Sequence, residues 1–234
     1  MDSDITFPDL APEHLAAELA EKGYATRTIL TPGTCRALAA LYGHEELFRK
    51  RIVMAQHAYG QGEYKYLAYP LPAPVAALRE ALYPPLAHVA NDWRRALGEA
   101  GTFPPTLTEY LARCHDAGQT RPTPLLLRYE AGGFNCLHQD LYGDLAFPLQ
   151  VVILLSEPGR DFTGGEFMLV EQRPRAQSRG QVVPLAQGEA AIFPVHHRPA
   201  QGKRGTYRLT TRHGVSRVHT GLRQTLGLIF HDAA

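Results

Sequence analysis

Residues 126–144 read LLRYEAGGFNCLHQDLYGD, and this stretch decides the fold and the chemistry that we expect of the chain. Alternate residues of a strand point to the same face, so His138 and Asp140 should project together into the interior of a β sandwich or barrel. An imidazole and a carboxylate on one face provide two ligands of a metal site. A His-x-Asp triplet also arises by chance as a surface or capping pair, so it needs support from elsewhere in the sequence.

The sequence from residue 124 onward supports a β core around this triplet. Short apolar runs recur between glycines, prolines and polar turns, among them LQVVILL, GEFMLV, AAIFPV and RQTLGLIF. Strands of this length, separated by such turns, are typical of a sandwich or barrel.

The first 120 residues have a different, mainly helical pattern. Apolar spacing and capping residues predict helices at 12–22, after Thr31, at 74–98 and at 105–116, with Pro84-Pro85 breaking or kinking the third. Residues 52–69 predict a β-hairpin that carries Tyr59, Tyr64, Tyr66 and Tyr69. We therefore expect an α+β protein with one domain over 1–234. In it, 1–120 is a helical support packed on the major sheet and 121–234 is the catalytic core.

A third metal ligand must come from the histidines of the β core, which are His196, His197, His213, His219 and His231. His213 is the best candidate, because it ends the alternating segment 206–212, whereas the others lie in a turn or near the ends of the final strand. That final strand begins at Arg223, whose burial would be costly unless its guanidinium met an anion. Two histidines and one carboxylate with open positions suit a non-haem Fe(II) that activates dioxygen.

At this point the sequence resembles the Fe(II)/2-oxoglutarate oxygenases of the prolyl 4-hydroxylase type. Tyr129 lies nine residues before His138, and the pair Gly164-Gly165 is similar to the glycines that precede a strand in that family. His213 stands 73 residues after Asp140, and Arg223 stands ten residues after His213.

The resemblance implies a double-stranded β-helix, or jelly roll, and a role for each matching residue. His138, Asp140 and His213 would bind Fe(II), and Arg223 would hold the distal carboxylate of 2-oxoglutarate. Tyr129 and Thr225 would add hydrogen bonds to that carboxylate. Apart from the resemblance, the position of Asn135 on the strand that leads into His138 predicts that its side chain reaches cosubstrate or substrate. The family uses O₂ and converts 2-oxoglutarate to succinate and CO₂ as it hydroxylates a prime substrate, and ascorbate would stimulate the reaction.

The prime substrate has two candidate classes. The ten-residue spacing before Arg223 favours the prolyl-hydroxylase branch, whose members mostly act on proteins or amino acids. The whole chain also resembles uncharacterised bacterial oxygenases suggested to act on damaged nucleic acid, which makes AlkB-like oxidative dealkylation, a form of DNA repair, the alternative. For that alternative, residues 59–69 could stack a base and the arginines of 171–181 would form a mobile lid at the site mouth. A non-catalytic jelly-roll binding or sensing module is the third hypothesis.

Composition limits the partners and the cellular location that we expect for this protein. The net charge of +1 hides an acidic part and a basic part. Residues 1–170 hold 14 Lys and Arg against 20 Asp and Glu, and residues 171–223 hold 10 against 2. No apolar run is long enough to span a membrane, and no secretory signal begins the chain. Three widely spaced cysteines favour a reducing, cytoplasmic location, and Cys136 is expected to be a buried packing residue. The oligomeric state is not predicted.

Overall fold

The computed structural model describes residues 5–6, 9–141, 143–203 and 205–234. Its helices are α1 (Pro12–Lys22), α2 (Pro32–Ala40), α3 (Ala73–Leu97) and α4 (Leu107–Asp116), with short 3-10 turns η1 (Leu41–Gly43), η2 (Glu45–Leu47) and η3 (Met54–His57). Its strands are β1 (Ala25–Thr28), β2 (Phe48–Val53), β3 (Gly60–Gln61), β4 (Glu63–Leu67), β5 (Leu125–Glu130), β6 (Phe134–His138), β7 (Leu149–Leu154), β8 (Phe162–Gly164), β9 (Phe167–Gln172), β10 (Ser178–Val183), β11 (Glu189–Pro194), β12 (His197–Gly202), β13 (Gly205–Val215) and β14 (Val218–Leu228).

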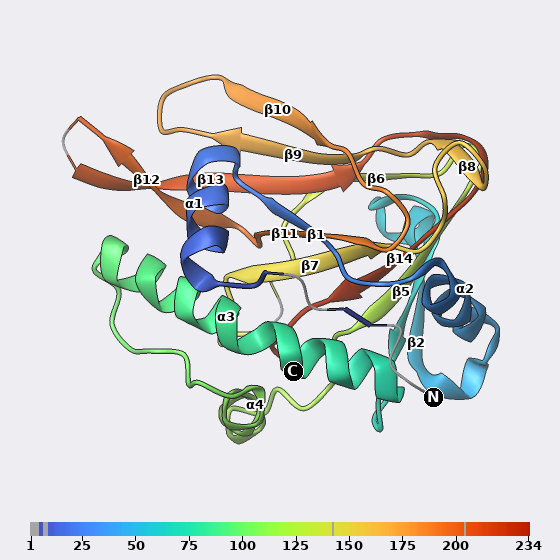
Figure 1. Cartoon of the computed structure of the whole chain (residues 1–234), viewed down its shortest axis with the longest axis horizontal. Coiled ribbons are helices and arrows are strands. Elements are labelled where there is room, and N and C mark those ends of the chain that lie inside the picture. The colour runs from blue at the N-terminus through green and yellow to red at the C-terminus, as the bar shows by residue number, and fades with distance from the viewer. Residues whose placement is uncertain (1–4, 7–8, 142, 204) are drawn as a thin grey trace.

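Two antiparallel sheets face each other in this structure (Figure 1). The larger, eight-stranded sheet runs in the order β1-β11-β7-β14-β5-β4-β2, with β8 also paired to β14. The smaller, six-stranded sheet runs β10-β9-β13-β6-β3, with β12 also paired to β13. Strands that are distant in sequence lie side by side in both sheets, as in a jelly roll. The expected α+β jelly-roll fold is confirmed.

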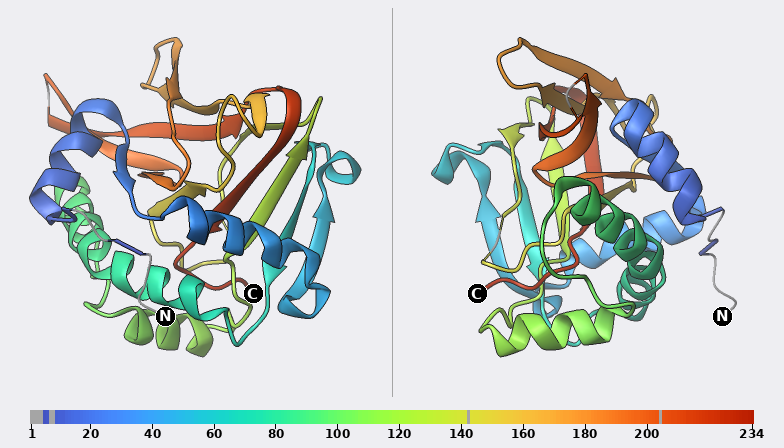
Figure 2. Two further views of the ribbon diagram at one scale, coloured as in Figure 1. Left: turned by 45° about the vertical axis from the view of Figure 1, so that its right-hand side comes forward. Right: turned by 90° about the vertical axis from the view of Figure 1, so that its left-hand side faces the viewer.

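The helices gather on the side of the larger sheet that faces away from the smaller one (Figure 2). One core cluster joins apolar residues of α1 to α4 with the outward-facing residues of the larger sheet, including Val151, Ile153, Leu226 and Leu228. This burial against the sheet fixes the helices in place, as the sequence predicted.

Helix α3 excludes one of the two outcomes expected at Pro84-Pro85, a break, while a kink stays a prediction. It runs unbroken from Ala73 to Leu97, although Pro84 and Pro85 lie inside it. Each proline removes one backbone hydrogen bond, but Leu82, Tyr83 and Leu86 are fully buried on the face that meets the sheet. Packing of that face stabilises the helix across the missing bonds. No helix in the described ranges is long and apolar enough to cross a membrane.

The predicted hairpin is confirmed and joins the two sheets. Strands β2 and β4 pair from Phe48↔Leu67 to Val53↔Glu63 within the larger sheet, so the ladder begins before residue 52. The connection between them contains η3 and then β3, which pairs with β6 of the smaller sheet through Gly60↔Asn135. The hairpin therefore brings Tyr59 next to the strand that carries His138.

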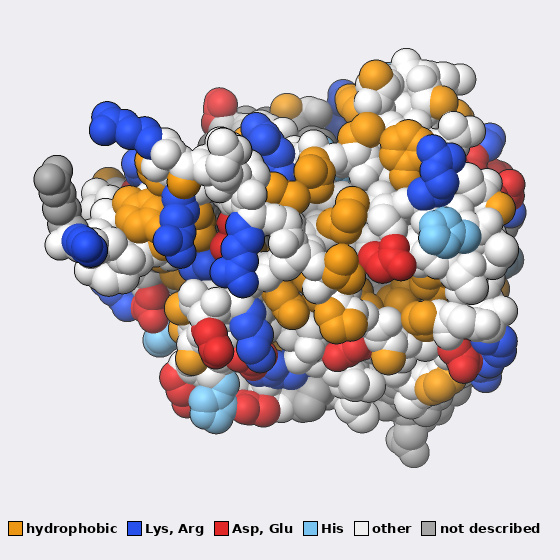
Figure 3. Space-filling view, turned by 90° about the horizontal axis from the view of Figure 1, so that it is seen from above, with side chains coloured by type: hydrophobic (Ala, Val, Ile, Leu, Met, Phe, Trp, Pro, Cys, Tyr) orange, Lys and Arg blue, Asp and Glu red, His pale blue; other side chains and the backbone are white. Residues whose placement is uncertain are grey.

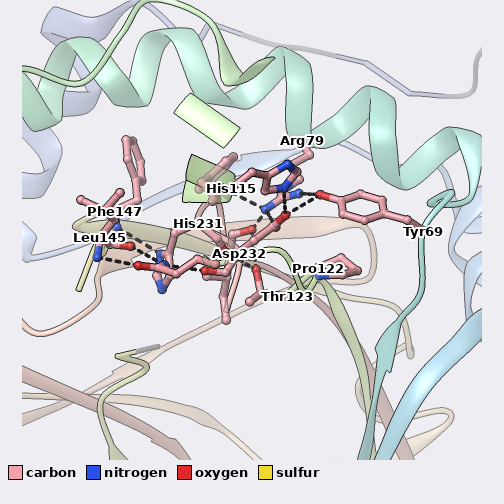
Figure 4. Close-up of polar contacts among 12 residues, drawn as sticks. Tyr69, Arg79, His115, Pro122, Thr123, Leu145, Phe147, His231 and Asp232 are labelled. Carbon is pink, nitrogen blue, oxygen red and sulfur yellow. Dashed lines mark hydrogen bonds and ion pairs between the residues drawn. The ribbon is translucent and has the colours of Figure 1, made fainter. Parts of the chain in front are cut away.

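A buried ion pair ties the end of the chain to α3 (Figure 4). Arg79 Nη2 lies 2.9 Å from Asp232 Oδ1, and Arg79 Nε donates to the carbonyl of Ile229 at 3.0 Å. Tyr69 donates its hydroxyl to Asp232 Oδ2 at 2.8 Å, and His115 Nε2 lies 2.9 Å from the same oxygen. These contacts attach the segment after β14 to helix α3.

Candidate active site

Three potential metal ligands meet between the two sheets. His138 ends β6 and pairs across the ladder with His213 of β13. Asp140 Oδ1 lies 3.5 Å from His138 Nε2, and Asp140 Oδ2 lies 3.3 Å from His213 Nε2. One ligand atom from each residue falls within 4.8 Å of the others. Asp140 lies beyond the end of β6, so strand alternation, which we used to place it, is not what orients it.

The contacts of these side chains determine how they are oriented and whether they are protonated, and both affect the binding of a cation. The ring of His138 contacts the carbonyl of Cys136 through Nδ1 at 2.8 Å, which leaves Nε2 facing the other two residues. Burial alone would raise the pKa of Asp140, but its contacts with His138 and His213 outweigh burial and hold that pKa well below its usual range. Burial lowers the pKa of His213, and the nearby His138 lowers it further. Burial lowers the pKa of His138, but its contact with Asp140 outweighs burial and raises that pKa. A carboxylate and a neutral imidazole are the forms that bind metal, so Asp140 and His213 already have the required form, and a cation competes with a proton for His138.

Arg223 is a buried cation that forms no ion pair with the described residues, although the charge of Glu166 favours its protonated form. Its side chain is 1% exposed, and its Nε and Nη1 have no hydrogen-bond partner in the described part of the chain. The nearest rings are those of Tyr129 and Phe162, at 5.7 and 5.9 Å from the guanidinium carbon. Burial lowers the pKa of Arg223 to about 10. A buried guanidinium with free donors is stabilised when an anionic ligand enters beside it.

One cavity of about 430 Å³ collects all seven residues selected from the sequence. Beyond the three ligand candidates and Arg223, it is lined by Tyr129, Asn135 and Thr225. Asn135 Nδ2 donates to the hydroxyl of Tyr129 at 3.4 Å, and Tyr129 pairs with Arg223 between β5 and β14. The structure thus brings these residues together, while the role of each remains a prediction.

Sequence reasoning missed Gln150, a buried residue of β7. Its Nε2 lies 3.1 Å from His213 Nε2, across the space between the sheets. Phe167 and Phe193 also reach this space, with ring centroids 6.0 and 4.8 Å from that of His213. Gln150 belongs to an otherwise apolar run, and no motif spacing distinguishes it.

The surroundings of the cavity differ from expectation in two ways. Cys136 is exposed and lines the cavity, so the buried packing role was wrong. The arginines of 171–181 flank the turn of the β9–β10 hairpin, and none of the three lines the cavity. Seen from above, basic side chains gather over the turn ends of the β9–β10 and β12–β13 hairpins, and the centre of the face is largely uncharged (Figure 3).

The tyrosines of the hairpin separate into different environments. Tyr59 and Tyr64 line the cavity, and Tyr59 is 49% exposed at its edge. Tyr66 is buried within the sheet, and Tyr69 binds Asp232 far from the site. Only part of the cluster is therefore available to a ligand.

Comparison with known proteins identifies the family. The model of the Oxygenase-NA family, described as an oxygenase catalysing oxidative methylation of damaged DNA, matches residues 62–233. Two uncharacterized proteins of Mycobacterium tuberculosis, from strains CDC 1551 and H37Rv, are each 52% identical over 165 residues. The match covers 70% of this chain and 71% of theirs. The chain belongs to this oxygenase family.

Solved structures share its fold at low sequence identity. A Pseudomonas putida prolyl-4-hydroxylase has a TM-score of 0.52 and 15% identity, covering 95% of this chain and all of its own. A Trichoplax adhaerens prolyl hydroxylase has a TM-score of 0.51 and 12% identity, covering 94% and 89%. A non-heme alpha-ketoglutarate-dependent epimerase from nogalamycin biosynthesis scores 0.52 at 18% identity, covering 93% and 81%. Hydroxylases and an epimerase share this architecture, so the fold alone does not determine the reaction.

Family, fold and donor set agree on one class, the Fe(II)- and 2-oxoglutarate-dependent oxygenases. The protein is therefore an enzyme, and the hypothesis of a non-catalytic binding module is set aside. Its residues fit both groups, because two imidazoles and one carboxylate suit Fe(II). The free donors of Arg223 in turn suit a carboxylate.

Proposed function

We propose that this enzyme uses Fe(II), 2-oxoglutarate and O₂ to oxidise a damaged, alkylated base in nucleic acid. The match to the damaged-DNA oxygenase family over 62–233 is the observation that carries this proposal. Hydroxylation of an N-methyl group gives a hemiaminal that releases formaldehyde, so we expect removal of the methyl group. The free thiols of all three cysteines support a cytoplasmic location as part of this proposal.

The residues of the cavity divide the work as follows. His138, Asp140 and His213 would hold the iron, which when bound supplies the oxidation of a C–H bond as 2-oxoglutarate becomes succinate and CO₂. Arg223 would bind the distal carboxylate, with Tyr129 and Thr225 beside it. These residues position the reactants and exclude water, and the wall around them determines which substrate enters.

The edge of the cavity offers a surface on which a base can stack. The rings of His57 and Tyr59 lie parallel within 23°, with centroids 5.3 Å apart, and both side chains are exposed. Leu137 and Leu141 line the same cavity and are 43% and 47% exposed. An exposed aromatic and apolar edge favours an unpaired or flipped base, which has two apolar faces.

One observation favours a second candidate, the hydroxylation of a protein or amino-acid residue. Among the described residues that line the cavity, Arg223 is the one Lys or Arg, and we assign it to the cosubstrate. Phosphates of a nucleic-acid substrate would then have to be bound farther away, by the basic hairpins of Figure 3.

An assay with single-stranded oligonucleotides carrying N-methylated bases tests the first candidate. With Fe(II), 2-oxoglutarate and ascorbate, we expect formaldehyde in an amount equal to the extra succinate that the oligonucleotide induces, and neither product with His213→Ala. Tyr59→Ala should raise KM for the oligonucleotide roughly tenfold through lost stacking, and leave oligonucleotide-independent 2-oxoglutarate turnover unchanged. Tyr24→Ala, at a tyrosine that lies outside both the cavity lining and the two basic hairpins, is the control. Succinate formation that responds to peptides and to no methylated oligonucleotide would refute this function and favour the second.

A further inference from the structure

Gln150 reaches the three ligand candidates from the opposite sheet. It belongs to β7 of the larger sheet, whereas His138 and His213 belong to the smaller one. Its side chain is 3% exposed, so it is removed from bulk water. Its Nε2 lies 3.1 Å from His213 Nε2, and its Oε1 has no hydrogen-bond partner in the described part of the chain.

Binding of a metal ion to His213 would remove the hydrogen bond between Gln150 and His213. His213 Nε2 is the atom that also lies 3.3 Å from Asp140 Oδ2, so it faces the shared site. When its lone pair binds a metal ion, it can no longer accept a hydrogen bond from Gln150. In the orientation that the structure shows, the amide then has no side-chain hydrogen-bond partner among the described residues, although it is buried. Buried amides are almost always satisfied, so a ligand is expected to satisfy this one.

The cosubstrates cannot satisfy both halves of the amide. Ionised 2-oxoglutarate and O₂ carry hydrogen-bond acceptors and no donor, so neither can bind the oxygen of Gln150. The position of Gln150 along the larger sheet also places it away from the 2-oxoglutarate anchor. Thr225 pairs with Leu154, which places Arg223 six residues along the ladder from Gln150, about 20 Å at about 3.3 Å per residue. Gln150 thus lies at the end of the cavity away from the cosubstrate anchor.

We propose that Gln150 hydrogen-bonds the prime substrate and selects methylated bases that carry an amino group beside the methylated nitrogen. This inference rests on the proposed function. Cytosine methylated at N3 presents its N4 amino group as a donor to the Gln150 oxygen. Thymine methylated at N3 presents a carbonyl at that position, which leaves the Gln150 oxygen unpaired. It is also neutral, whereas the methylated cytosine is a cation near neutral pH, so the decisive quantity is how the Gln150 variants change the discrimination between the two bases. A site that hydrogen-bonds one substrate group discriminates against the analogue lacking it.

The experiment compares two oligonucleotides that differ only in these bases. We expect the wild-type enzyme to process the methylated cytosine with a kcat/KM about tenfold above that of the methylated thymine. Gln150→Leu and Gln150→Met, which keep the volume and remove the hydrogen bonds, should bring this ratio close to one. Two such variants are used so that a folding defect in one does not decide the result. Gln201→Leu, at an exposed glutamine of the β12–β13 hairpin, is the matched control.

Binding measurements separate this role from one at the metal. In both variants, the dissociation constants for Mn(II) and 2-oxoglutarate should stay within about twofold of wild type. An unchanged ratio of the two bases in both variants, or weaker binding of metal or 2-oxoglutarate, would overturn the proposal for Gln150 alone. Wild-type enzyme that consumes 2-oxoglutarate but acts on neither oligonucleotide would overturn the proposed function as well.

Discussion

Gly165 leaves open the space that the side chain of Arg223 occupies. A β-carbon at Gly165 would lie 2.8 Å from Arg223 Cδ and 2.9 Å from Val218 Cγ2. Gly165 also has φ +64°, in the left-handed region that favours glycine. The second glycine of the pair that the sequence singled out therefore has a physical function, since it lets the loop between β8 and β9 lie against the buried arginine.

Gly165→Ala should weaken 2-oxoglutarate binding about tenfold, because the new methyl group displaces the guanidinium from its place in the cavity. Metal affinity should not change, since the ligands lie elsewhere. Titrations of 2-oxoglutarate and Mn(II) measure both effects. Gly180→Ala is the control, because a β-carbon there meets only Val170 Cγ2, at 3.9 Å. Equal 2-oxoglutarate affinity in the two variants would contradict this explanation.

Arg223→Met should have opposite effects on stability and on binding. A neutral side chain of similar length removes the cost of a buried, unpaired charge, so the free energy of unfolding without ligand should stay equal or rise. The requirement for 2-oxoglutarate should rise about 100-fold through loss of a charge-assisted bidentate contact, with iron binding nearly intact. Thermal unfolding without ligand and 2-oxoglutarate titration check the two halves. A parallel loss of iron affinity would mean that Arg223 has a structural role.

Asp140→Ala should abolish most metal binding. In the wild type, Fe(II) or Mn(II) binds the folded state and should raise the unfolding temperature, and a chelator should reverse the rise. The variant should show little response to either treatment, because the two remaining imidazoles lack the charged ligand. A metal titration indistinguishable from wild type would place the carboxylate ligand elsewhere in the chain.

His231 should make stability depend on pH. Burial lowers its pKa to about 4, and its Nδ1 accepts the backbone N–H of Phe147 at 3.1 Å, which requires the neutral ring. Because the unfolded chain binds this proton near pH 6.5, stability is complete above that value. It is lost as the pH falls toward 4, by about 2 kcal/mol at pH 5. Denaturant unfolding at pH 7.5 and 5 should show a smaller difference for His231→Asn. The difference should not vanish, since burial lowers the pKa of His196 to about 4 as well. The same difference in both proteins would exclude His231 as a cause.

The residues that carry a motif were predictable from sequence. Tyr129, His138, Asp140 and Arg223 are recognisable because fixed spacing along the sequence relates them to one another. Strand alternation led us to place Asp140 beside His138, although Asp140 lies beyond the end of β6. The same argument could not find Gln150, because its neighbours in space lie on the other sheet and its neighbours in sequence are apolar.

Two parts of the sequence prediction were wrong. Pro84 and Pro85 were expected to break or kink α3, and the break is absent because tertiary packing of the helix outweighs the local cost of the prolines. The arginines of 171–181 were placed at the site mouth as part of the nucleic-acid hypothesis. In the structure, the register Thr210↔Gln172 carries their hairpin past His213 and away from the cavity.

Cys136 gives the enzyme a built-in position for a reporter group. Its thiol is exposed at the cavity edge two residues before His138, whereas Cys35 and Cys114 are buried. A thiol-reactive fluorophore added to the unmodified protein would therefore attach at one place. Its emission would follow the arrival of substrate in real time, without any engineered cysteine.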